Sequence, residues 1–182
     1  MSSLNLKSLA RLAVVASLST GMFLGLTACF KPLYGPTASG ESLQTVLAAI
    51  DVPEIDWPDN QAVMGHYLRS ELIYALNGSG STTPKRYALK LALTKSLTTP
   101  VVDTETGRAS SAIVGGTLTY TLTSLDGSKI ITQGSATSSA SFDRSTQRFA
   151  TLRAGRDAEI RLAKVLAEQV KTRLAATLSA GS

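Results

Sequence analysis

Residues 113–124 alternate between apolar and threonine side chains, and this pattern constrains the fold more than any other stretch of the chain. The apolar side holds Val114, Leu118, Tyr120 and Leu122, and the opposite side holds Thr117, Thr119, Thr121 and Thr123. A period of two is the period of an extended strand. The segment therefore predicts a β-strand with one buried face and one polar face.

Two further segments predict strands beside it. Residues 86–94 (RYALKLALT) place Tyr87, Leu89, Leu91 and Leu93 on one side and Arg86, Lys90 and Thr94 on the other. Residues 129–142 are more thinly apolar, with Ile130, Ala136, Ala140 and Phe142. The segment DTETG (103–107) supplies a turn before the central strand, and Asp126 with Gly127 supplies a tighter turn after it. The three strands should form an antiparallel meander.

Two segments have helical periodicity. In residues 61–76 apolar side chains recur at steps of three and four, after Asp59 or Asn60 as a cap and before Asn77 or Gly78 as a terminator. The last segment starts near Thr146 and tolerates Gly155 at a cost of about 1 kcal/mol relative to alanine. Its apolar stripe consists of Ile160, Ala163, Leu166, Ala167, Val170, Leu174 and Leu178.

Residues 43–52 (LQTVLAAIDV) have apolar side chains at both odd and even positions, which predicts a strand covered on both faces. The expected order is then strand, helix, three strands, helix. Helices with one apolar stripe and a sheet with one apolar face bury one another. We expect an α+β two-layer sandwich of two helices on one face of a mainly antiparallel or mixed four-stranded sheet. The other face, rich in Thr, Ser and Lys, is left for solvent or a partner.

The N-terminus resembles an export signal. Lys7 and Arg11 precede an apolar stretch, 12–26, that is too short for a transmembrane helix, which needs roughly 20 apolar residues. Leu26, Thr27 and Ala28 before Cys29 are similar to the bacterial lipobox, whose cysteine thiol accepts a diacylglyceryl group. We expect residues 1–28 to be a lipoprotein signal peptide, 29–40 a lipidated tether and 41–182 the α+β domain. A retained anchor helix, or an intermolecular disulfide through the single cysteine, is the alternative.

The charge is mildly basic. The formal net charge is +5, and removal of residues 1–28 leaves 16 Lys and Arg against 13 Asp and Glu, a charge of +3. Acids gather in 41–71, whereas 85–95 holds four basic residues and 144–173 holds eight. A basic surface suits an anionic partner such as a phosphorylated glycolipid or acidic headgroups, although an ordinary solvated face is the simpler interpretation of these charges. No basic motif interleaved with aromatic residues supports nucleic acid as the partner.

Catalytic and metal-binding motifs are not found in the sequence. His66 is the only histidine and should be exposed on the helix 61–76, and no G-x-S-x-G stretch accompanies it. One histidine and one cysteine cannot form a zinc site, and the acids in 51–59 do not have EF-hand spacing. We expect no enzymatic activity, no metal and no cofactor apart from the covalent lipid on Cys29.

Taken together, several stretches resemble the lipopolysaccharide-assembly lipoprotein (LptE) family, in particular its short alphaproteobacterial type. They are the lipobox running into CFKPLYG, the turn DTETGR, the strand GGTLTYTL and the closing helix DAEIRLAKVLAEQVKTRL. Family members commonly have a small residue between the lipidated cysteine and a phenylalanine, whereas here Phe30 follows Cys29 directly. This difference alters the length of the tether.

The resemblance implies a role for the chain without catalysis. It would be an outer-membrane lipoprotein on the periplasmic side that plugs the LptD β-barrel, supports its assembly and contacts lipopolysaccharide. The candidate contacts are Lys85, Arg86, Lys90, Lys95 and Arg108, and sorting to the outer membrane fits Phe30 in place of the aspartate that retains lipoproteins at the inner membrane. The alternative is a periplasm-facing lipoprotein that serves as a scaffold or subunit of another envelope transport complex.

Overall fold

The computed structural model describes residues 40–181, except residues 56, 79, 81, 101, 103, 104, 106 and 108. The described residues belong to one compact unit, Pro36–Ser182. The predicted signal peptide, the tether up to residue 39, Cys29 and Arg108 lie outside the described residues. The predicted domain 41–182 lies within this unit.

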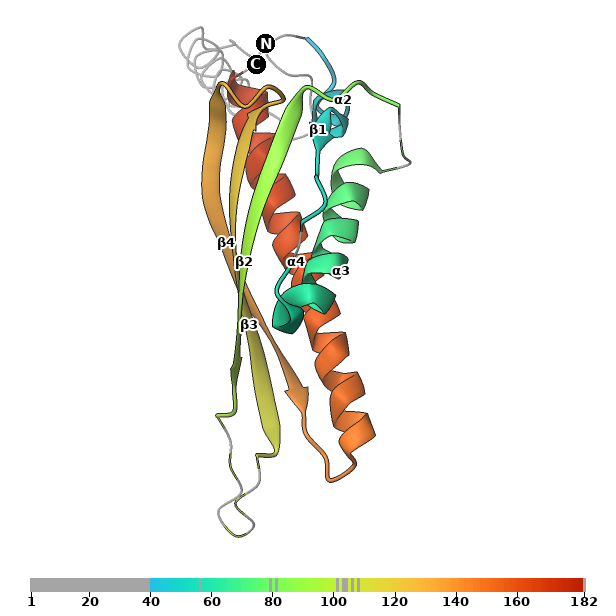
Figure 1. Ribbon diagram of the computed structural model, residues 1–182, viewed down its shortest axis with the longest axis vertical. Coiled ribbons are helices and arrows are strands. Elements are labelled where there is room, and N and C mark those ends of the chain that lie inside the picture. The colour runs from blue at the N-terminus through green and yellow to red at the C-terminus, as the bar shows by residue number, and fades with distance from the viewer. Residues whose placement is uncertain are drawn as a thin grey trace, which may run out of the picture. The chain divides into compact units, whose positions relative to one another are not determined.

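The described elements form two layers. They are α2 (Leu43–Ala48), β1 (Ile50–Asp51), α3 (Asp59–Asn77), β2 (Tyr87–Thr98), β3 (Ser111–Ser124), β4 (Ile130–Asp143) and α4 (Arg148–Gly181). The sheet has the order β1-β2-β3-β4, with β1 parallel to β2 and the other pairs antiparallel. Helices α3 and α4 lie on the same side of the sheet (Figure 1). The predicted α+β sandwich with a mixed four-stranded sheet is confirmed.

The meander has the predicted faces. Leu89, Leu93, Leu118 and Leu122 are buried beneath the helices. On the open face Lys90 lies beside Thr121, and Thr94 lies beside Thr117. Thr123 departs from the prediction because it is buried and its hydroxyl donates to the Ala88 carbonyl, at the point where the register with β4 shifts.

The prediction of one strand over 43–52 was wrong. Residues 43–48 form helix α2, and only Ile50 and Asp51 pair with β2. Ser42 caps the helix, since its hydroxyl oxygen accepts from Thr45 N at 3.2 Å. Leu43, Val46 and Leu47 also match helical spacing. A short helix inside the core has buried residues at both odd and even positions, and so does a strand covered on both faces, so the sequence pattern does not separate the two.

Helix α3 begins after Pro58, which makes no side-chain cap, so Asp59 and Asn60 lie inside the helix instead of capping it. It ends at the expected place, where Gly78 has φ 53° and donates to Tyr74 O. His66 is exposed, as predicted.

Helix α4 begins at Arg148, close to the expected start, and passes through Gly155 without a break.

Both helices contact the sheet at Gly116 of β3. A Cβ built there would lie 2.8 Å from Met64 Cε of α3 and 3.1 Å from Leu166 Cδ1 of α4. The φ of Gly116 is not positive, so the position requires glycine for space and not for its backbone conformation. The two layers therefore meet over a stretch of bare backbone.

Candidate functional site

The predicted basic residues do not form one cluster. Lys85 Nζ donates to the carbonyls of Ala48 and Ile50, at 2.9 Å each, and so stabilises the turn between α2 and β1. Arg86 donates to both carboxylate oxygens of Glu41, at 3.0 and 2.9 Å. Neither charge is directed at a shared site.

The other two described candidates lie on opposite faces of β2. Lys95 points toward the helices, where its Nζ lies 2.8 Å from Glu159 Oε1 and the two side chains are only 21% and 18% exposed. Lys90 is exposed on the open face of the sheet. None of these placements tests a contact with a lipid.

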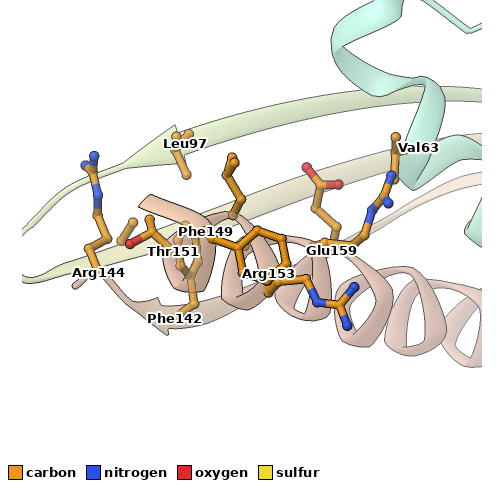
Figure 2. Close-up of a pocket in the computed structure, with 12 residues that line it drawn as sticks. Val63, Leu97, Phe142, Arg144, Phe149, Thr151, Arg153 and Glu159 are labelled. Carbon is orange, nitrogen blue, oxygen red and sulfur yellow. The ribbon is translucent and has the colours of Figure 1, made fainter. Parts of the chain in front are cut away.

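A pocket of about 570 Å³ lies along the first turns of α4. We call it the arginine pocket. Its lining combines apolar side chains with three arginines, and its residues are Val63, Leu97, Ala112, Phe142, Arg144, Phe149, Thr151, Leu152, Arg153, Gly155, Arg156 and Glu159. Figure 2 shows Leu97 on its strand and Val63 on its helix across from these turns.

Two hydrogen bonds hold the link between β4 and α4 beside the pocket. Ser145 N donates to Thr151 Oγ1 at 3.0 Å, and Thr151 Oγ1 donates to Ser145 O at 3.1 Å. The ring of Phe142 lies against Gly155, and its atoms would be 3.4–4.0 Å from a Cβ at that position, which is ordinary contact distance. The start of α4 is thereby held close to the end of β4.

The pocket is electropositive and exposes apolar surface. Phe149 is 74% exposed, Leu97 64% and Leu152 63%, which is unusual for large apolar side chains that lie together. In the described part of the chain, none of the three arginines is ion-paired, whereas the pocket's one carboxylate, Glu159, is paired with Lys95. Arg153 also lies over the Phe149 ring, 5.8 Å from its centroid.

This combination suits an anionic amphiphile. Arginine pairs with phosphate or carboxylate through two parallel hydrogen bonds. The neighbouring leucines and phenylalanines offer apolar contact for a hydrocarbon chain. Among the described residues no group of three or more His, Cys, Asp or Glu side chains is placed to hold a metal ion.

The sequence pattern indicated the basic stretch 144–173 but not this pocket. Arg144, Arg153 and Arg156 belong to that stretch, so the positive charge of the pocket could be read from the sequence. Their apolar neighbours Leu97 and Ala112 come from other strands, and only the meander brings them to the start of α4.

The open face of the sheet is the second surface of interest. Its three long strands present mainly Thr and Ser side chains, for example Thr94 on β2, Thr117 on β3 and Thr137 on β4. Asp143, at the end of β4, is the only carboxylate on this face of the three strands. The face is thus polar and nearly free of negative charge.

The family model for lipopolysaccharide-assembly LptE matches residues 47–174. A crystal structure described as a lipoprotein of Caulobacter crescentus is similar to this chain, with a TM-score of 0.60 and 22% identity over 77% of this chain and 97% of that one. Rare lipoprotein B of Shewanella oneidensis is similar with a TM-score of 0.51 and 12% identity, over 70% of this chain and 94% of that one. At these identities the two structures establish the fold alone. No curated protein matches the sequence.

No helix within the described ranges has both the length and the hydropathy needed to cross a membrane.

Proposed function

Because the chain belongs to the lipopolysaccharide-assembly LptE family, we propose that it partners an LptD β-barrel as plug and assembly factor in the transport of lipopolysaccharide to the cell surface. The observation that carries the proposal is the family match over residues 47–174, which spans every described element from the end of α2 to most of α4. The role requires no catalysis and no cofactor.

The open face of the sheet supports the role of a plug. The interior of a large outer-membrane barrel is polar and hydrated. A face of Thr and Ser side chains, exemplified by Thr94, Thr117 and Thr137, can form hydrogen bonds with such a wall without burying an unpaired charge. The helical layer covers the other face of the sheet (Figure 1), so the apolar side chains there are already buried within the chain.

Anchoring at the outer membrane completes the proposal. Cys29 carries the lipid, residues 1–28 are removed, and the tether leads to the folded domain. Burial of acyl chains contributes about 0.8 kcal/mol per CH₂, and two or three chains on one cysteine hold the protein stably.

Within this role the arginine pocket is the better candidate for contact with lipopolysaccharide than Lys85 or Lys95. It offers apolar side chains together with arginines that have no ion pair in the described part of the chain. Lys85 is occupied by backbone carbonyls and Lys95 by Glu159. Lipopolysaccharide carries both phosphates and acyl chains, so it matches both parts of the pocket.

Purification of a tagged, full-length protein in detergent tests the partnership. We expect a large β-barrel to co-purify in a stoichiometric amount, and depletion of the chain should reduce both assembled barrel and surface lipopolysaccharide. A chain that serves another envelope complex would leave both unchanged, and that result would refute the proposed function.

The contact with lipopolysaccharide has its own test. Arg153→Glu reverses one charge in the pocket, and Lys164→Glu makes the same change at an exposed position farther along α4, outside the pocket. We expect Arg153→Glu to weaken binding of purified lipopolysaccharide by about ten-fold and Lys164→Glu to have little effect. Equal losses would mean that the attraction is general and that the pocket is not the site.

A further inference from the structure

The two edges of the sheet are treated differently. At the β4 edge, three side chains of α4 donate to backbone carbonyls of the strand. Arg161 Nη2 donates to Ser141 O at 3.0 Å, Gln169 Nε2 to Thr137 O at 3.5 Å, and Arg173 Nη1 to Ser135 O. These bonds occupy acceptors that a further strand would need, which is a common protection of an edge.

Among the described residues, the β2 edge has no such protection over most of its length. Strand β1 pairs only with Tyr87 and Ala88, so no described strand lies beside β2 on that side from Leu89 onward. Arg86 O accepts from Leu125 N on the β3 side, while Tyr87 N donates to Ala49 O on the other side. In an antiparallel ladder this alternation continues, so the odd-numbered residues of β2 direct their N–H and C=O groups to the free edge.

The end of this edge is accessible. The side chains of Thr94, Ser96, Leu97 and Thr98 are all exposed. None of the described side chains donates to or accepts from a backbone group of 93–98 at the free edge. Leu93, Lys95 and Leu97 thus present a short row of backbone donors and acceptors that matches an extended strand.

The side chains beside the edge indicate the chemistry of that strand. On the helix side lie Leu97 and Val63, both in the lining of the arginine pocket. On the open face, Lys90 lies three residues before Leu93, exposed and without a carboxylate neighbour on β2 or β3, where a strand added along the edge would reach it if it extended past Leu93. A strand that continues the sheet would place alternate side chains against the leucine and valine and the others beside the lysine.

We propose that the free edge of β2, over Leu93–Thr98, is a strand-addition site for an extended segment of a partner protein in which apolar residues alternate with acidic ones. Backbone hydrogen bonds supply the affinity and the alternation supplies the specificity. A second copy of the chain fits less well, because its β2 contains no carboxylate and would leave Lys90 unpaired. The inference rests on the edge of β2 and on Val63 of α3, and it does not depend on the proposed function.

A labelled peptide of alternating valine and glutamate, titrated into the folded protein, tests the site by fluorescence anisotropy. The control peptide has the same composition with valines and glutamates in separate blocks. Leu97→Pro removes one outward N–H, which an edge strand tolerates, and Ser139→Pro makes the equivalent change on the β4 edge. We expect only the alternating peptide to bind, about ten-fold more weakly with Leu97→Pro and unchanged with Ser139→Pro.

Several results would overturn the proposal. These are equal binding of the block peptide, wild-type affinity of Leu97→Pro, and a dimer of the wild-type chain in sedimentation that Leu97→Pro abolishes. If Leu97→Pro does not fold, Lys90→Glu decides, because this exposed substitution should weaken the valine–glutamate peptide and strengthen a valine–lysine peptide. Unchanged affinity of both peptides for Lys90→Glu would equally refute it.

Discussion

Replacing Gly116 by alanine should destabilise the fold, because both helices contact the sheet at this residue. The added Cβ would lie 2.8 Å from Met64 Cε, 3.1 Å from Leu166 Cδ1 and 3.3 Å from Leu162 Cδ2. Favourable carbon–carbon contacts lie at about 3.5–4.0 Å, so three side chains must shift at once. Overpacking of this kind costs about 1–3 kcal/mol. Alanine recovers about 0.4–1 kcal/mol through the lower entropy of the unfolded chain, which leaves a net loss of about 1.3 kcal/mol at the midpoints of the two ranges.

Thermal and urea unfolding of purified protein measure this loss, with about 2–4 °C in Tm for each kcal/mol in a domain of this size. Gly155→Ala is the matched control. Its Cβ meets Phe142 only at 3.4 Å and beyond, so the same substitution should stabilise helix α4 by about 1 kcal/mol. Met64→Leu removes the nearest clashing carbon, and it should restore part of the stability of Gly116→Ala in a double-mutant cycle. A Gly116→Ala protein as stable as wild type, or no coupling to Met64, would refute the packing argument.

Three other predictions concern separate parts of the chain. Lys85→Met removes both hydrogen bonds to Ala48 O and Ile50 O and should lower the free energy of unfolding by about 2 kcal/mol in urea titrations, whereas an unchanged value would mean that water replaces the ammonium. The Ser124 hydroxyl and the Ser128 backbone N–H and hydroxyl lower the pKa of Asp126, so this carboxylate stabilises the fold above its ordinary pKa and loses that effect as the pH falls through the lowered value. Asp126→Asn should therefore be less stable than wild type at neutral pH and equal to it in acid, which unfolding at a series of pH values will test. Cys29→Ala should yield an uncleaved precursor without lipid, and mass spectrometry of a normally processed chain would contradict the lipobox assignment.

The long elements were predictable because their periodicity extends over many residues. Strand β3 and helix α4 contain 14 and 34 residues, and their buried faces agree with the pattern in the sequence. Helix α2 was not predictable in this way. Its 6 residues span too few turns for the two periods to differ, and the Ser42 cap and burial in the core decide for the helix.

The basic residues of β2 show the same limit of local patterns. A strand pattern predicts on which face of the sheet a side chain lies, and it correctly placed Lys90 on the open face. It cannot tell what lies across from that face, so the ion pair of Lys95 with Glu159, 64 positions away, was not foreseen, and the contact of Lys95 with lipid stays a prediction.

The amino-acid sequence by itself predicts the alternating strands, the amphipathic helices and the lipidation of Cys29, since each of these patterns depends on neighbours within a few residues. The arginine pocket, and the contrast between the protected β4 edge and the free β2 edge, became visible only in the tertiary structure. Both arise where strands and helices distant in the chain meet, and the free energy of such contacts depends on spatial neighbours that no local pattern encodes.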